Sequence, residues 1–410
     1  MSFEVARGYS AGMQLSHPWG MTNVWLFLFV AFSMIILCSI CLRKRDKIGV
    51  IGLVGILAFL LFIAFKAGFV RHDHHEVVAM AVLVSIAVIV VSFCRGSIFT
   101  LLAYQLLAAS LVLYFLCVQL HLKNPSFMPR FNQTFQMGGL SDFARLLTGR
   151  VNVDECYKLD MNLIAEKQSF VLPAGTVDLY PWGGIDTLYA NKLNVRHRPV
   201  FESYSAYTPR LTRINEAFLN GGTAPDCLLF AVRSIDQRFP TMDDGLSWPT
   251  ILTHYDVIGG QHGYLLMKRR ESPRPHQLFH MNNIQIHPNT EITLPKADAI
   301  WIQIDLPLTV RGKLLQQIYK PATLVLLVRL SDGGTHSFRL VPGEASTGFL
   351  VSPIIPNNEA FALFQSKPDD QRLSPLRPLA IAISGEDGFR EHYDFDGAKL
   401  SFFRLEFDKK

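Results

Sequence analysis

The chain has 410 residues, of which 49% are hydrophobic and 18% are charged, and its formal net charge is +5. So small a charge for this length gives no sign of a nucleic-acid-binding protein. The hydrophobic excess is concentrated in the first 120 or so residues, so the composition combines two classes of protein in one polypeptide.

Four uncharged apolar runs fill this N-terminal part, at residues 24–42, 48–65, 77–94 and 98–120. Each run is long enough to cross roughly 30 Å of hydrocarbon as a helix. The alternative is that the runs are buried helices of a soluble protein. Such helices would need amphipathic helices around them, and the short polar segments between the runs provide none. We therefore predict an integral membrane protein with four transmembrane helices. The lipid bilayer is thus an expected partner of the protein.

The basic residues beside the runs predict the topology. The cluster Arg43, Lys44, Arg45 and Lys47 follows the first run, whereas a cleavable signal peptide carries its positive charge before the apolar run. Such a cluster is expected to stay in the cytoplasm. The loop at Arg95 then also faces in, whereas the N-terminal tail, the loop at Arg71 and the residues after Leu120 face out.

After the last run the patterns change twice. Residues 121–150 predict a connector, with a short helical pattern at 141–147, and residues 151–270 alternate helix and strand signals that predict a small α/β domain. The segment ESPRPHQ reads as a linker. Residues 276–410 contain short apolar strands separated by turn signals, which predict an all-β sandwich or jelly-roll domain.

Two cysteines, Cys156 and Cys227, lie in this soluble part. They could pair if the part faces the oxidising side of the membrane, although two cysteines make no disulfide framework.

The most unusual local feature is a run of ionisable residues between the second and third apolar runs, Arg71-His72-Asp73-His74-His75-Glu76. Asp73 or Glu76 could act as a base toward a sugar acceptor or bind a divalent cation. Arg71 could hold a phosphate as a bidentate donor, and the three histidines would add substrate contacts. The alternative is structural, because Asp73 and Glu76 have the spacing of a helix cap and first-turn acid at the start of the third helix.

Three strings carry a resemblance to a known class of protein: FKAGFVRHDHHE, RPVFESYSAYTPRL and APDCLLFAVRSIDQRFPTMDD. They resemble uncharacterised bacterial polytopic membrane proteins that look like lipid-carrier-dependent, multi-spanning glycosyltransferases of the GT-C-like kind. The resemblance implies a bacterial inner membrane, a soluble domain on the periplasmic side, and catalysis or metal binding by an acid in an outward loop. Asp73 would be that acid, with Glu76 second. The four runs depart from this pattern, because such transferases build their cavity from many more spans.

In the predicted α/β domain, a cluster of polar and aromatic residues lies near strand ends. Tyr204 and Tyr207 could stack on sugar rings and Arg238 could bind a substrate. Turns and local salt bridges are the alternative use of such residues. No Walker-type loop, dinucleotide glycine fingerprint, G-x-S-x-G elbow or HExxH motif occurs in the sequence.

Two functions of different classes follow from these patterns. The first is a non-catalytic, membrane-anchored module of the cell envelope that binds a glycan or another membrane subunit. The second is a glycosyltransferase, or a fragment of one, that uses a lipid-linked sugar. The small number of spans favours the module, because four helices can form only a small cavity for a carrier lipid.

Overall fold

The computed structural model of the chain describes residues 2–43, 47–121, 144–150 and 152–407. Most of the predicted connector at 121–150, together with Lys44 and Arg45 of the basic cluster, therefore lies outside the described residues. The described part of the predicted short helix, residues 144–147, is helical. The chain divides into two compact units. We call them the membrane unit (Met13–Arg150 and Ile318–Lys320) and the globular unit (Met1–Gly12, Val151–Gln317 and Pro321–Lys410).

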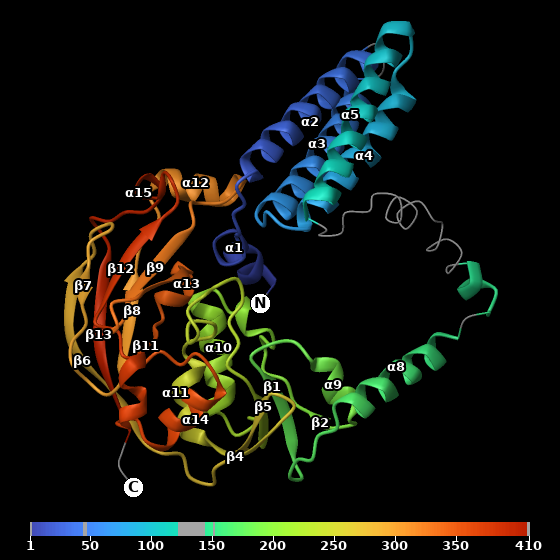
Figure 1. Cartoon of the computed structure of the whole chain (residues 1–410). Helices are drawn as coiled ribbons and strands as arrows, with labels where there is room; N and C mark the ends of the chain where they lie inside the picture. Colours follow the sequence, from blue (N-terminus) through green and yellow to red (C-terminus); the bar gives the residue numbers. More distant parts are fainter. Residues whose placement is uncertain (1, 44–46, 122–143, 151, 408–410) are drawn as a thin grey trace. The chain divides into compact units, whose positions relative to one another are not determined.

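The membrane unit is built from four long helices (Figure 1), α2 (Gly20–Leu42), α3 (Lys47–Phe69), α4 (His75–Phe93) and α5 (Ser97–His121). Among the described residues, these four are long and apolar enough to cross a membrane, which confirms the predicted spans. Short connections make successive helices antiparallel. The helices α3 and α4 approach closely at Gly68, where an added Cβ would lie 2.4 Å from the Cβ of Ala79.

The first sheet of the globular unit has five strands in the order β2-β1-β3-β5-β4. The strands β1 (Thr176–Tyr180), β2 (Asn194–Val195) and β3 (Cys227–Phe230) are parallel, whereas β4 (Tyr255–Gln261) and β5 (Tyr264–Arg269) form an antiparallel hairpin. Its connecting helices are α9 (Ile185–Ala190), α10 (Pro209–Asn220) and α11 (Ser247–His254), with the short η1 (Ser203–Ser205) and the preceding α8 (Val153–Lys167). This is the α/β architecture that the sequence predicted.

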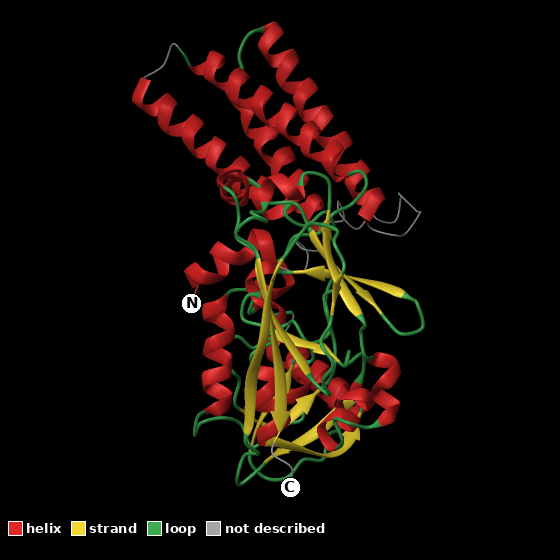
Figure 2. Cartoon of the chain, turned by 90° about the vertical axis from the view of Figure 1, so that its left-hand side faces the viewer, coloured by secondary structure: helices red, strands yellow, loops and turns green. Residues whose placement is uncertain are grey.

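Two four-stranded antiparallel sheets follow (Figure 2, strands in yellow). One has the order β10-β9-β12-β7 and comprises β7 (Ile292–Thr293), β9 (Leu324–Arg329), β10 (Thr335–Leu340) and β12 (Ala380–Gly385). The other has the order β11-β8-β13-β6 and comprises β6 (His276–Gln285), β8 (Ile300–Asp305), β11 (Phe349–Ser352) and β13 (Lys399–Phe407). The helices of this part are α12 (Val310–Ile318), α13 (Pro342–Ala345), α14 (Asn358–Ser366), α15 (Phe389–His392) and η2 (Gln371–Leu376). Alternate residues of β9 are buried, although its sequence LVLLVR is almost uniformly apolar, because successive side chains of a strand point to opposite faces of the sheet.

The α/β and all-β stretches share one hydrophobic core. Phe230 and Trp248 from the first stretch pack in the same cluster as Trp301, Leu350 and Phe361 from the second. The rings of Phe230 and Phe361 lie 4.2 Å apart. The segment ESPRPHQ, predicted to be a linker, runs directly into β6. The predicted linker thus marks a change of secondary-structure pattern within one compact unit. The two stretches belong to the same unit because their apolar faces are buried against each other.

The N-terminal helix α1 (Ser2–Gly12) also belongs to the globular unit, although it is far from the rest in sequence. Added Cβ atoms at Gly8 and Gly12 would lie 2.5 Å and 2.4 Å from the ring of Tyr207, so both positions need glycine for this contact. The Tyr207 hydroxyl donates a hydrogen bond to the Val5 carbonyl at 2.7 Å. The sequence predicted only an outward-facing tail here.

We expect Phe361→Ala to destabilise the whole globular unit, since the side chain is fully buried in the shared core. Removing a buried Phe ring costs about 3–5 kcal/mol, which corresponds to a fall of roughly 10 °C in the melting temperature. Thermal unfolding of the detergent-solubilised chain, followed by near-UV circular dichroism, measures the change. The control is Leu379→Ala at an exposed leucine. Unfolding of the globular unit in two steps, of which only one moves, would contradict the shared core.

Candidate functional site

The run of ionisable residues at 71–76 forms the loop between α3 and α4 and the first turn of α4. Leu15 pairs with Arg71 in an isolated bridge, and the rings of His17 and His121 lie 5.7 Å apart. The segment before α2, this loop and the end of α5 therefore meet at one end of the bundle. Tyr319 and Lys320, from the C-terminal part of the chain, join them there: the Lys320 Nζ donates to the Leu15 carbonyl at 2.5 Å.

Asp73 is the partly exposed acid of this loop, with 22% of its side chain accessible. One oxygen accepts the backbone N–H of His75 at 3.0 Å and contacts its Nδ1 at 2.5 Å, and the other accepts from Arg71 Nε at 2.9 Å. The backbone contact satisfies a free N–H at the start of α4, although His74 and not Asp73 is the N-cap residue, so the contact differs from the cap that the spacing predicted. Although partial burial raises the pKa of Asp73, the hydrogen bonds from His75 and Arg71 lower it to about 2.

Glu76 has the opposite environment, since none of its surface is exposed. Its carboxylate accepts from Asn23 Nδ2 at 2.6 Å and contacts His121 Nε2 at 3.0 Å and His72 Nδ1. The other ring nitrogen of His72 lies 2.6 Å from the Tyr319 hydroxyl. Glu76 thus ties α2, α4 and α5 together at one end of the bundle, where it has no accessible surface to offer a substrate.

Three neighbouring side chains offer metal-binding atoms. The ligand atoms of Asp73, His74 and His75 lie within 4.8 Å of one another, and His74 is exposed. One carboxylate and two imidazoles suit a transition-metal ion such as Mn²⁺ or Zn²⁺ better than Mg²⁺. To bind an ion, His75 would exchange its contact with Asp73 for the metal. Arg71, held against Asp73 and the Met13 carbonyl, would stay beside such a site.

The structure places Tyr204, Tyr207 and Arg238 in the globular unit. Arg238 is fully buried and donates to Asp243 and Glu344, both at 2.7 Å, and to the carbonyls of Tyr204 and Gly12. Tyr207 is buried under α1. These contacts are structural, because they hold α1, η1 and α13 together and leave the Arg238 and Tyr207 side chains inaccessible.

A shallow, solvent-open pocket lies elsewhere on this unit, outside the carboxyl ends of β1 and β2. This is the edge at which α/β folds commonly bind ligands. Trp182 and Gly183 come from the segment after β1, and His197, Phe201 and Glu202 come from the segment after β2. The full lining is Leu179, Trp182, Gly183, Ile185, His197, Phe201 and Glu202.

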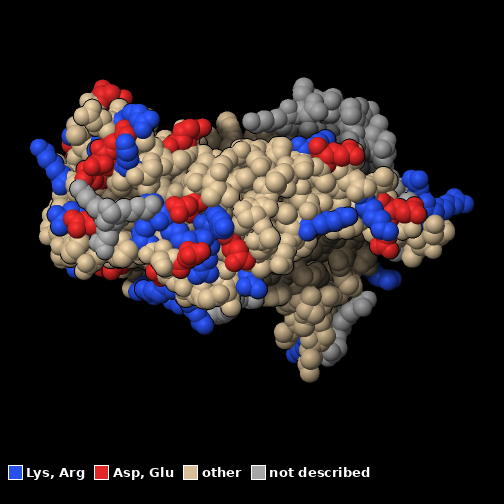
Figure 3. Space-filling model, turned by 90° about the horizontal axis from the view of Figure 1, so that it is seen from below, with Lys and Arg blue, Asp and Glu red and all other residues tan. Residues whose placement is uncertain are grey.

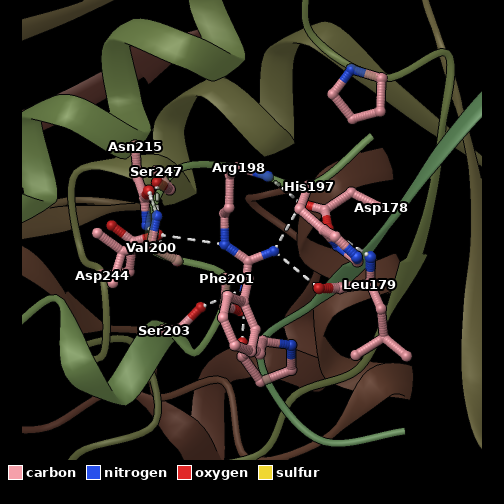
Figure 4. Close-up of polar contacts among 12 residues, drawn as sticks. Asp178, Leu179, His197, Arg198, Val200, Phe201, Ser203, Asn215, Asp244 and Ser247 are labelled. Atoms are coloured by element: carbon pink, nitrogen blue, oxygen red, sulfur yellow. Dashed lines mark hydrogen bonds and ion pairs between the residues drawn. The ribbon is translucent and has the colours of Figure 1, made fainter. Parts of the chain in front are cut away.

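The buried guanidinium of Arg198 joins the two walls of this pocket (Figure 4). On the β1 side it donates to the carbonyls of Leu179 at 2.7 Å and Pro181 at 2.6 Å. On the other side it donates to the Phe201 carbonyl and to the Ser203 hydroxyl. Its charge is balanced by Asp178 at 2.8 Å. The guanidinium is planar and rigid, and it donates hydrogen bonds to the segment after β1 and to the segment after β2. This single side chain therefore fixes the distance between the two segments.

The polar groups of the pocket are held in place. His197 Nδ1 lies 3.1 Å from Asp178 and its Nε2 lies 3.4 Å from the Tyr189 hydroxyl. Burial raises the pKa of the Glu202 carboxyl, against the opposing effects of Arg198 and a hydrogen bond from the Gly183 backbone. Phe201 is 44% exposed, so an apolar face and two ionisable groups are available to a ligand.

Sequence reasoning did not single out Trp182, His197, Phe201 or Glu202. A signal was present, since an aromatic residue and a Gly-Gly pair directly follow one predicted strand, and HRPVFE follows the next short extended segment. The two segments lie side by side only because β1 and β2 are parallel neighbours.

Comparison of the chain with protein families, curated proteins and solved structures gives no match. The site geometry is therefore the basis for a functional assignment.

The network behind the pocket predicts a pH-dependent stability. Burial raises the pKa of Asp244 to about 7, even though Arg198 and hydrogen bonds from Asn215 and Ser247 act to lower it. The folded chain therefore keeps a proton that the unfolded chain releases near pH 4, so the stability conferred by this proton is present at low pH and is lost as the pH rises to 7.

We expect Asp244→Asn to remove this dependence. Relative to the variant, the wild-type free energy of unfolding should fall by about 2–3 kcal/mol between pH 5 and pH 8. Thermal melts of both proteins across this range measure the difference. Parallel pH profiles would show that Asp244 does not carry the raised pKa.

Proposed function

We propose that the protein is a membrane-anchored module of the bacterial cell envelope whose globular unit binds a glycan. The observation that carries the proposal is the pocket at the carboxyl ends of β1 and β2. Trp182 and Phe201 offer aromatic surface on which a sugar ring can stack, and Glu202 offers a partner for its hydroxyl groups. His197 Nε2 would offer a second by exchanging its 3.4 Å contact with Tyr189. The pocket is a shallow depression open to solvent, so we expect its aromatic side chains to contact one face of a ring in a longer glycan and not to enclose a ligand.

Surface charge also supports a neutral ligand. On the face seen in Figure 3, Lys and Arg side chains alternate with Asp and Glu and are separated by wide uncharged areas. A polyanion such as a nucleic acid is bound by a surface of one sign. A neutral or weakly charged glycan needs no such surface.

The location belongs to the same proposal. The basic cluster after the first span supports a cytoplasmic location for that end of the bundle, so we expect the opposite end to face out. Tyr319 and Lys320 lie with the α3–α4 loop at that outer end. We infer an inner-membrane protein with the globular unit on the periplasmic or extracellular side.

Replacing Trp182 with Ala should weaken glycan binding about 10-fold or more, because the variant loses the stacking surface while the polar groups remain. The assay is binding of a panel of soluble neutral and N-acetylated oligosaccharides to the full chain in detergent. Tyr157→Ala is the matched control, since Tyr157 is an exposed aromatic residue on α8. Failure of the wild-type chain to bind any of these sugars, or equal loss in the control, would contradict the proposal.

A glycosyltransferase that uses a lipid-linked sugar is the second candidate function. The partly exposed Asp73 with His74 and His75 favours it, because these residues offer a cation site beside Arg71, and a cation together with Arg71 suits the phosphate of a carrier lipid. With a pKa of about 2, Asp73 is a poor general base near pH 7 and a good ligand for a cation. Glu76, being buried, would support the loop.

Under this second function, Asp73→Asn should abolish sugar transfer from a polyprenyl-phosphate sugar without lowering the melting temperature by more than a few degrees. Wild-type transfer should show no acid limb from Asp73 above pH 4, since its carboxyl stays ionised there. The control is Asp370→Asn, which removes another Arg-paired Asp with a pKa of about 2. Unchanged transfer by the Asp73 variant would exclude the assigned role.

A further inference from the structure

The helix α12 carries an apolar stripe that faces away from the rest of the globular unit. Val310, Leu314 and Ile318 are 76%, 59% and 57% exposed. They are spaced four residues apart, so they lie along one face of the helix. Three large exposed aliphatic side chains on one short helix form a continuous surface, unlike the scattered exposed residues that are common on soluble proteins.

The opposite face of α12 is fixed to the globular unit. Gly312 is buried there, and an added Cβ would lie 2.1 Å from the His392 carbonyl at the end of α15. The Thr309 hydroxyl donates to the Glu391 carbonyl at 2.6 Å. At about 100° per residue, Gly312 lies on the side of the helix opposite to Leu314. The close contact at Gly312 therefore determines that the apolar stripe points outward.

The chain itself ties the C-terminal end of α12 to the membrane helices. Tyr319 follows α12 directly, and its hydroxyl lies 2.6 Å from His72 Nε2 while its ring lies 5.5 Å from the ring of Phe65 on α3. Lys320 bonds to the Leu15 carbonyl in the same unit. Consecutive Cα atoms are about 3.8 Å apart, so Ile318 cannot be far from the outer end of the bundle.

The charges of α12 suit a lipid surface. Arg311 and Lys313 are exposed and lie on either side of the apolar stripe. Arg311 also pairs with Glu391. Apolar residues flanked by Lys and Arg are the pattern of helices that lie in the headgroup region of a bilayer, where the basic groups approach anionic lipids.

We propose that α12 is an interfacial helix that lies in the outer surface of the bilayer, with Val310, Leu314 and Ile318 inserted among the lipids. Burial of these three aliphatic side chains in this layer would add a second attachment to that of the four spans. Since α12 is fixed to α15, this attachment would also orient the globular unit on the membrane. The inference is independent of which ligand the pocket binds.

The test measures the depth of Leu314 in a membrane. The full chain carrying Cys156→Ser, which removes the exposed cysteine, and Leu314→Cys is labelled with an environment-sensitive fluorophore. It is then reconstituted into vesicles of phosphatidylcholine and phosphatidylglycerol that contain nitroxide-labelled acyl chains. We expect a blue-shifted emission and loss of most of the intensity relative to vesicles without nitroxide. Val310→Cys should behave in the same way if Leu314→Cys fails to fold.

Leu379→Cys in the same background is the matched control. Leu379 is an exposed leucine directly before β12, whereas Gly385, at the far end of this six-residue strand, packs beside Phe389 of α15. It therefore lies roughly 20 Å from the α15 end of the strand, and its probe should stay unquenched. If the probes at Leu314 and Val310 are no more quenched than the probe at Leu379, α12 does not enter the bilayer and the proposal is wrong, whatever else covers the stripe.

Discussion

The pocket of the globular unit depends on one buried guanidinium, that of Arg198. A fully buried cation is costly unless its hydrogen bonds and charge are satisfied. Arg198 meets this condition at its two terminal nitrogens, through Asp178 and the carbonyls of Leu179, Pro181 and Phe201, while its Nε lies 3.9 Å from Asp244. The guanidinium keeps its hydrogen-bond acceptors only while each of the segments after β1 and β2 keeps its conformation. Arg198 therefore makes both walls of the pocket rigid. Loss of either segment's contacts would leave N–H groups of a buried guanidinium without acceptors.

Two other buried charged groups, Arg238 and Glu76, also bond to several segments that are far apart in the sequence. Arg238 gathers Asp243, Glu344 and the carbonyl of Gly12, so the first helix of the chain is held to residues more than two hundred positions away. In the membrane unit, Glu76 gathers Asn23, His72 and His121. A buried polar group needs hydrogen-bond partners inside the protein. When these partners come from segments remote in sequence, the hydrogen bonds hold those segments together. These networks explain why residues with reactive side chains serve here as structural links.

Much of the fold could be predicted because its signals are local. The spans are long apolar runs, and strands such as β9 are short apolar runs that end at turn residues. The helix α1 was missed because its hydrophobic contacts, such as Gly8 and Gly12 with Tyr207, are with residues remote in sequence. The helix α12 was missed because it is short and lies between two strong strand patterns. The shared core at Phe230 and Phe361 was also missed, since a proline-rich segment between two patterns looks the same whether the patterns fold together or apart.

For the candidate sites, the sequence by itself determined which residues could do chemistry, and the tertiary structure decided which of them a ligand can reach. Asp73 and Glu76 look alike as neighbouring acids in one loop, yet one is partly exposed and the other is enclosed by three helices. Arg238 and Tyr207 look like ligand contacts, but packing of α1 and α13 removes them from the surface. Trp182 and Glu202 become neighbours only when β1 and β2 pair. Accessibility and proximity arise from contacts between distant segments, and a local pattern carries no record of these contacts.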